Sequence, residues 1–185
     1  TVEIPEIKIR QQIQTDAKGE ASFAVDAKKL ILWSQEQPKL YDVVISCKTD
    51  RITEKIGFRS IEVSGREILL NKKPVFLRGV CAHEENPLRG ARAYSKEDAR
   101  MLLTWARELN CNFMRLAHYP HNEYMARLAD EMGILLWEEI PVYWTIDFTN
   151  DATYRNAENQ LAELIGRDKN RASVIIWSVA NETPV

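Results

Sequence analysis

An amide and a carboxylic acid, Asn181 and Glu182, come directly after the apolar run 173–180, which has the pattern of a buried strand. A carboxyl group can donate or accept a proton, and an amide beside it can hydrogen-bond a substrate hydroxyl. The two residues therefore suggest acid–base chemistry on a polar molecule. Polar side chains follow three other strand-like runs in the same way: His83 and Glu84, Arg115 and His118, Glu138 and Glu139.

The residues after about 68 alternate between strand-like and helical patterns, which is typical of parallel α/β structure. Helix boundaries are marked in the sequence: Ser95 precedes Lys-Glu-Asp as an N-cap, and Gly133 follows Ala-Asp-Glu-Met as a C-cap glycine. We expect strands in 75–80, 111–117, 134–140 and 173–180, and helices in 95–109, 121–133 and 153–168.

Such units can form a doubly wound open sheet or part of a closed barrel. A doubly wound nucleotide-binding sheet should carry a glycine-rich turn after its first strand. The segment after residue 80 has neither a G-x-G-x-x-G nor a Walker pattern. Barrels collect catalytic residues from several strands at the carboxyl ends of those strands. We therefore expect residues 69–185 to form the N-terminal half of a TIM (β/α)8 barrel.

Residues 1–68 have a different pattern, in which short alternating segments are separated by turn-forming residues. This is typical of an antiparallel β-sandwich, so the predicted fold class is multi-domain β plus α/β. A tight hairpin is expected around 71–74, leading into the first strand of the barrel. Strands of the sandwich are expected in 7–13, 21–25, 41–47 and 59–63.

Composition argues against several classes of protein and partner. With 25 basic and 27 acidic residues among 185, the formal net charge is -2, and no nucleic-acid partner is expected. The apolar runs are too short to cross a bilayer, so no membrane partner is expected, and this segment has no signal-peptide pattern. The compartment is left open between cytoplasm and periplasm. Three widely spaced cysteines argue against a disulfide framework or a zinc knuckle.

Two stretches resemble the signature regions of glycoside hydrolase family 2, the retaining β-galactosidases, β-glucuronidases and β-mannosidases: "NFMRLAHYPHNEYMARLADEMGILLWEE" and "RDKNRASVIIWSVANE". The segment from "LYDVVISC" to "FLRGVCAHEE" is similar to the family's passage from its immunoglobulin-like domain into its barrel. The resemblance covers nearly the whole chain. It implies a partial immunoglobulin-like β-sandwich followed by the first half of a catalytic TIM barrel.

The resemblance also implies a retaining exo-β-glycosidase that acts by double displacement, with two carboxyl groups about 5 to 5.5 Å apart. Glu182 corresponds to the acid/base. Such an acid is expected to be buried near a second carboxylate, so that it is protonated near neutral pH. Asn181 corresponds to the amide that hydrogen-bonds the sugar 2-hydroxyl. His118 and His83 match histidines that line the sugar site.

Three further residues are expected to complete the site. Arg115 should orient the catalytic carboxylates, since a fixed guanidinium forks to a carboxylate, and Glu139 is a supporting carboxylate. Trp144 and its neighbour Tyr143 follow the third strand, where they either stack on a sugar face or fill the core. We expect Trp144 to contact the sugar.

The resemblance argues against a metal in this chain. Magnesium-dependent members of the family place a Glu and a His after the third strand, and the matching positions are Tyr143 and Thr145, which cannot replace them. We therefore expect no metal and no other cofactor. A metal-dependent hydrolase built on His83, His118 and His121 is a weaker alternative, because Tyr-Pro interrupts the spacing of the last two.

The family's nucleophile lies on a later barrel strand, beyond Val185. The chain is therefore expected to be the middle of a longer enzyme and inactive alone, with Glu138 and Glu139 as the only nearby substitutes. The alternative is a non-catalytic carbohydrate-binding or structural fragment. The expected partner is a carbohydrate substrate, either a β-galactoside or a β-glucuronide. A homo-oligomer formed through the open strand edges is also compatible with the sequence.

Overall fold

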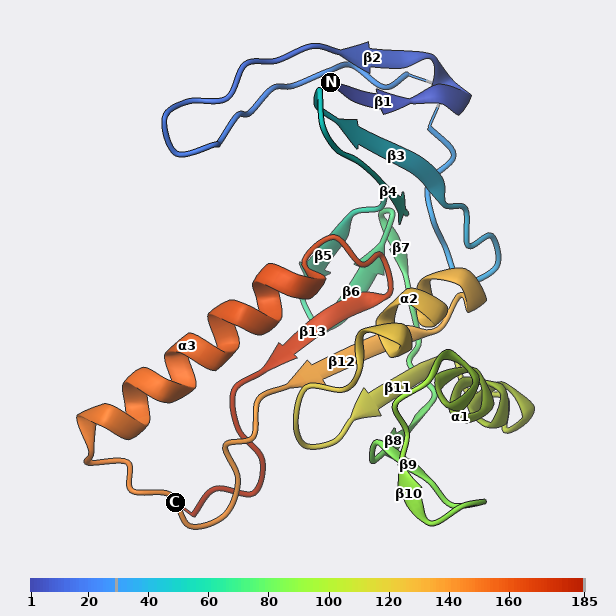
Figure 1. Ribbon diagram of the computed structural model, residues 1–185. Helices are drawn as coiled ribbons and strands as arrows, with labels where there is room; N and C mark the ends of the chain where they lie inside the picture. The colour runs from blue at the N-terminus through green and yellow to red at the C-terminus, as the bar shows by residue number, and fades with distance from the viewer. Residues whose placement is uncertain (29, 185) are drawn as a thin grey trace.

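The structure is a computed structural model that describes residues 1–28 and 30–184. An antiparallel β part is followed by a parallel sheet with helices (Figure 1). The predicted order of fold classes, β and then half of a barrel, is confirmed.

The N-terminal sheet has four antiparallel strands in the order β2-β1-β3-β4. A 3-10 turn, Pro5–Ile7, joins the first two strands. Burial in β3 does not follow a strict alternation, because the buried Tyr41 and Val44 lie on opposite faces of the strand and Ile45, on the same face as Tyr41, is exposed. The bounds are β1 Val2–Ile4, β2 Ile9–Gln11, β3 Tyr41–Ser46 and β4 Arg51–Ile56.

The strand expected in 21–25 is not formed. These residues have no regular secondary structure and are exposed, Phe23 by 40% and Val25 by 49%. Their alternation is that of a strand, but a strand also needs a partner for its backbone hydrogen bonds, and these residues do not pair with either outer strand of the sheet, β2 or β4. Strand β4, which the sequence analysis did not predict, pairs with β3 along its whole length.

A three-stranded antiparallel sheet follows, made of β5 (Ile61–Ser64), β6 (Glu67–Leu70) and β7 (Lys73–Pro74). Asn71 and Lys72 have φ of 52° and 66°, as a two-residue hairpin turn with two positive φ values requires, so the predicted hairpin is confirmed. The predicted division after residue 68 falls inside β6 and remains a prediction.

Four parallel strands then form a sheet in the order β13-β12-β11-β8. Three of them lie where the sequence predicts, whereas β8 begins at Gly79 rather than at residue 75. Strands β9 and β10 form a small hairpin after β8. The bounds are β8 Gly79–Ala82, β9 Glu85–Asn86, β10 Ala91–Arg92, β11 Phe113–Leu116, β12 Leu135–Glu139 and β13 Val174–Ser178.

The three predicted helices are confirmed as α1 (Lys96–Glu108), α2 (Glu123–Met132) and α3 (Asp151–Asp168). Ser95 caps α1 in a capping box with Asp98. Gly133 ends α2 with a φ of 72°, and a Cβ there would lie 2.3 Å from the carbonyl oxygen of Gln35. Helix α3 starts two residues earlier than expected, because Asn150 caps it.

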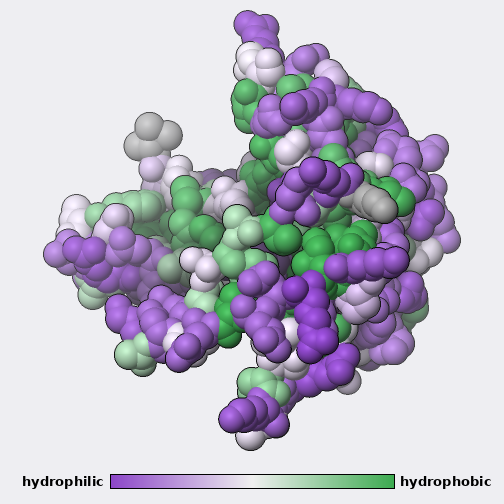
Figure 2. Space-filling model, turned by 90° about the horizontal axis from the view of Figure 1, so that it is seen from above, coloured by the Kyte–Doolittle hydropathy of each residue, from purple (hydrophilic) through white to green (hydrophobic). Residues whose placement is uncertain are grey.

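Helices α1 and α2 lie side by side against one face of the parallel sheet (Figure 1). The core between them contains Leu103, Leu128, Met114 and Leu136, which are all buried. Helix α3 runs beside β13 and stands apart from the other two helices. From above, apolar side chains gather toward the middle of the molecule and polar ones toward its periphery (Figure 2). Helices α1 and α2 do not cover the opposite face of the sheet.

A second core lies at the start of the parallel strands and ties the N-terminal part to the barrel half. Trp33, which is fully buried, packs there with Leu70, Leu135 and Ala172. Its indole N–H donates to the backbone oxygen of Asp130 at 2.8 Å. This core fixes the starts of the parallel strands, and the predicted polar residues lie at the carboxyl ends of the same strands. Among the described residues, no helix combines the length and apolarity needed to cross a membrane.

Candidate active site

The predicted polar residues lie at the carboxyl ends of β8, β11, β12 and β13. Strand register explains why two of them, Arg115 and Glu139, share a face with Trp137. Arg115 is opposite Cys81 on one side and Trp137 on the other, and Glu139 lies two residues beyond Trp137. Side chains at i and i+2 point to the same face of a strand. Arg115, Trp137 and Glu139 therefore meet on the face away from α1 and α2.

Arg115 and Glu139 form a forked ion pair. Arg115 Nη2 donates to both carboxylate oxygens of Glu139, at 2.7 and 3.0 Å, and Nε donates to Oε2 at 3.1 Å. Glu139 has no exposed surface. Its carboxylate also bonds His118 Nδ1 at 2.8 Å and accepts from Trp137 Nε1 at 3.2 Å. A buried charge needs partners of this kind, so Glu139 is a fully partnered anchor.

Asn181 joins this cluster through the same guanidinium. Arg115 Nη2 donates to Asn181 Oδ1 at 2.7 Å, and the backbone N–H of Asn181 donates to the carbonyl of Val142 at 2.8 Å. Since Oδ1 is the acceptor, the amide NH2 is turned away from Arg115. Arg115 thus orients an amide donor, in addition to the carboxylate it was expected to orient.

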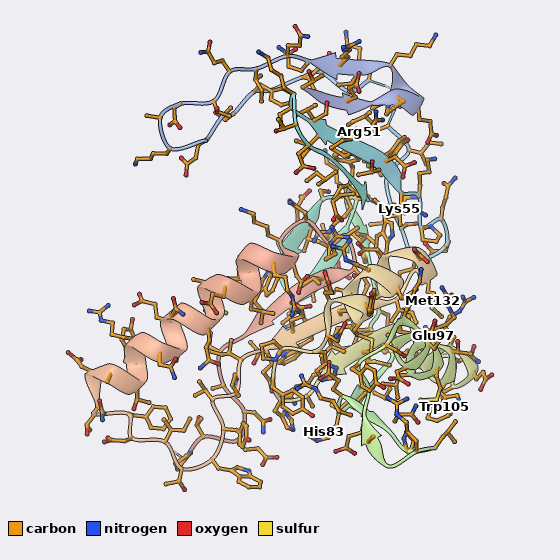
Figure 3. All side chains as sticks on the ribbon, viewed as in Figure 1. Arg51, Lys55, His83, Glu97, Trp105 and Met132 are labelled. Carbon is orange, nitrogen blue, oxygen red and sulfur yellow. The ribbon has the colours of Figure 1, made fainter. Side chains whose placement is uncertain are left out.

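The two histidines stand next to each other. The rings of His83 and His118 meet edge to face with centroids 5.3 Å apart, and the His118 ring is 6.4 Å from that of Tyr143. His83 Nδ1 lies 3.3 Å from the hydroxyl of Tyr119. His83 lies at the end of β8 in Figure 3. The two histidines and Tyr143 form a continuous aromatic row at the ends of the strands.

The third histidine lies outside this row. His121 is buried, and its Nε2 lies 3.0 Å from the carbonyl oxygen of Ala117. Burial lowers the pKa of His121, which favours the neutral ring. Within the described residues, no group of three or more His, Cys, Asp and Glu side chains is arranged to hold a metal ion.

Glu182 lies at the edge of the cluster and is exposed. Its Oε2 accepts from the indole N–H of Trp144 at 2.9 Å. The burial expected for an acid/base is therefore not seen, since this side of the strand ends is open in the described part of the chain. Trp144 is 63% exposed and meets Tyr143 edge to face with ring centroids 5.7 Å apart. It is surface rather than core.

Glu138 lies on the opposite face of β12 from Glu139. It is 2% exposed, and Arg167 Nη2 is 3.9 Å from its Oε1. Burial, and after it the charge of Asp168, raises the pKa of Glu138 to about 9. The structure therefore separates the two adjacent glutamates, and only Glu139 belongs to the cluster with Arg115. Glu84 is likewise buried and paired, with Arg92 and the backbone of Asn122.

Two residues that contact the predicted site residues, Trp137 and Tyr119, were not predicted from the sequence. Trp137 donates to Glu139, and its ring lies 5.0 Å from the Arg115 guanidinium carbon. Its i, i+2 spacing from Glu139 was a usable signal. The hydroxyl of Tyr119 also accepts from the backbone N–H of Glu84 at 3.3 Å. The sequence contained no comparable signal for Tyr119, because its partners are more than 30 residues away.

The chain is similar to known glycoside hydrolases along its length. The family model described as "Glycosyl hydrolases family 2, TIM barrel domain" matches residues 61–185, and the model "Glycosyl hydrolases family 2" matches residues 1–59. A β-galactosidase of Arthrobacter sp. (strain B7) is 31% identical over 192 residues, which cover 99% of this chain and 18% of that enzyme. The chain thus spans about a fifth of the length of the curated relatives it matches.

Two solved structures are also similar. A β-glucuronidase from Ruminococcus gnavus in complex with D-glucaro-d-lactam gives a TM-score of 0.77 at 32% identity, over 92% of this chain and 31% of that one. A family 2 β-galacturonidase from Eisenbergiella tayi bound to galacturonate gives 0.76 at 32% identity, over 83% of this chain and 28% of that one. By the match of both family models along its length, the chain belongs to glycoside hydrolase family 2.

Proposed function

We propose that this chain supplies the acid/base and the sugar-orienting groups of a retaining exo-β-glycosidase that acts on terminal β-galactosides or β-glucuronides. The observation that carries the proposal is the shared guanidinium. Arg115 Nη2 bonds both the buried carboxylate of Glu139 and the amide oxygen of Asn181, the residue before Glu182. Three strand ends are thereby fixed to one another beside a carboxylic acid.

In this proposal, Glu182 donates its proton to the leaving oxygen and later takes a proton from the attacking water. The Asn181 NH2 donates to the sugar 2-hydroxyl, and the row of His83, His118 and Tyr143 lines the sugar. Trp144 lies beyond Tyr143 at the end of this row. Arg115 and Glu139 hold these groups in place.

The second carboxylate of the double displacement comes from outside the described residues. Glu138 is unsuited because it faces the opposite side of the sheet, and Glu139 because its oxygens are already bonded to Arg115 and His118. The proposal therefore includes that the chain acts only as part of a longer enzyme and is inactive alone. The proposal also includes a domain boundary between residues 1–68 and residues 69–185, and it is compatible with a homo-oligomer.

A second candidate is a carbohydrate-binding fragment without catalytic activity. The observation in its favour is that Glu182 is exposed and has only Trp144 as a hydrogen-bond partner among the described side chains. In that case the row of aromatic rings would bind a sugar, and Glu182 would be a surface carboxylate.

Hydrolysis of aryl β-galactosides, β-glucuronides and β-mannosides distinguishes the two. The assay compares this chain with the longer enzyme, each with and without Glu182→Gln. We expect activity only in the longer enzyme, and a roughly 100-fold or greater loss of kcat/KM in the Gln variant on the preferred sugar. Glu158→Gln on the exposed face of α3 is the matched control. Equal activity of the two Glu182 forms would exclude the acid/base role, and turnover by the 185-residue chain would refute the external nucleophile.

A further inference from the structure

The loops after β12 and β13 are joined at their tips. Tyr143 and Asn181 form a parallel β-bridge, and the backbone N–H of Asn181 donates to Val142 at 2.8 Å. The strand pairing thus continues beyond the end of β12, and it brings the next residue of each loop, Trp144 and Glu182, side by side.

Both residues have an uncommon backbone conformation. Trp144 has a φ of 56° and Glu182 a φ of 48°, in the left-handed region that large side chains rarely adopt. In this conformation the Trp144 Nε1 lies 2.9 Å from Glu182 Oε2. Among the described side chains, Trp144 is the hydrogen-bond donor to this carboxylate. Both residues that make this contact have a sparsely populated backbone conformation. Such conformations cluster at functional sites, which suggests that the contact has a function.

We propose that Trp144 is a positioning residue for the acid/base, because its indole N–H fixes the rotamer of the exposed Glu182 carboxyl group at the leaving oxygen of the glycoside. This inference rests on the proposed function and deepens it. It also changes the role expected for Trp144 from its sequence, which was to contact the sugar. The indole packs edge to face against Tyr143 and donates its N–H to Glu182.

An exposed glutamate has several rotamers of similar energy, so without a partner its carboxyl group spends most of its time out of position. One oxygen held by Trp144 leaves the other free to carry the transferred proton. Proton donation matters most when the leaving group is a poor one. A positioning role therefore predicts a loss that depends on the leaving group, whereas sugar stacking predicts a loss common to all substrates of one sugar.

The test uses the longer enzyme and a series of aryl and alkyl glycosides of its preferred sugar, with leaving groups from strongly acidic phenols to simple alcohols. Trp144→Phe keeps an aromatic ring but removes the N–H. We expect kcat/KM to be nearly unchanged for the most acidic phenol and to fall roughly tenfold or more for the alcohol. Trp105→Phe is the matched control, because Trp105 lies on α1 (Figure 3). It should leave kcat/KM unchanged for both leaving groups.

A double variant makes the test independent of folding effects. In the Glu182→Gln background there is no acid to position, so adding Trp144→Phe should cause no further loss. The same factor lost in both backgrounds, or a loss equal for all leaving groups, would overturn the positioning role. If Glu182→Gln itself showed no dependence on the leaving group, the proposed function would fail. If Glu182→Gln showed the dependence on the leaving group and Trp144→Phe did not, the positioning role of Trp144 would fail and the proposed function would stand.

Discussion

Two adjacent glutamates on β12 show how differently one side-chain type behaves on the two faces of a sheet. Glu139 faces the ends of the barrel strands and bonds Arg115, His118 and Trp137. Glu138 faces α3, and its Oε2 has no hydrogen-bond partner in the described part of the chain. Both are almost fully buried. The partners that the fold brings to each face, and not burial alone, decide whether the carboxylate is an anchor or a protonated core group.

The largest effect is expected at Arg115. Arg115→Met should lower the free energy of unfolding by about 4 kcal/mol, because it leaves the Glu139 charge buried with much weaker partners. Urea unfolding at neutral pH measures the loss. Arg155→Met removes the arginine of an exposed pair with Glu158 on α3 and should cost about 0.5 kcal/mol or less.

A double variant separates the cost of an unpaired charge from the cost of lost packing. Arg115→Met combined with Glu139→Leu should recover most of the stability, since no buried charge remains. If the double variant were as unstable as Arg115→Met alone, the pairing of Glu139 would not be what stabilises this face.

Part of this arrangement could be predicted from the sequence. The alternation of strand-like and helical segments correctly predicted four strands and three helices, and the polar residues after the strands indicated where Arg115, Glu139 and Asn181 cluster in the structure. Alternation within "LLWEE" could also have shown that Glu138 and Glu139 lie on opposite faces. The rest depends on partners distant in sequence: Asp168 lies 30 residues from Glu138, and the alternation in 21–25 did not reveal that these residues pair with no strand of the sheet. The bond between Trp144 and Glu182 depends on loop conformations that periodicity does not predict.

The opposite face can be tested through pH. Glu138 has a folded-state pKa of about 9, far above its ordinary value of 4.5, so the folded protein holds a proton that the unfolded chain releases. Its contribution to stability is complete below pH 4.5 and is lost as the pH rises toward 9. Glu138→Gln is permanently neutral and removes this dependence. The variant should gain stability over the parent as the pH rises from 4.5 toward 9, and at pH 4 the two should be similar.

Unfolding of both proteins between pH 4 and pH 9 measures this difference. Burial also raises the pKa of Asp130, to about 6, and both proteins share this part of the pH dependence, whereas the repulsion between the Asp130 and Glu138 charges is present only in the parent. Two stability curves that stay parallel over the whole range would contradict the assignment of Glu138 as a protonated core residue.

The smallest effect is expected from the hydrogen bond between Trp137 and Glu139. Trp137→Phe removes one of the three side chains that bond Glu139 but leaves an aromatic ring next to the Arg115 guanidinium. Because the ion pair with Arg115 and the contact with His118 remain, we expect a loss of only about 1 kcal/mol in urea unfolding. Trp105→Phe, in which the indole is on the surface of α1, corrects for the change of ring size. Equal losses in the two variants would mean that the 3.2 Å bond from Trp137 contributes nothing, and that Arg115 and His118 alone hold Glu139.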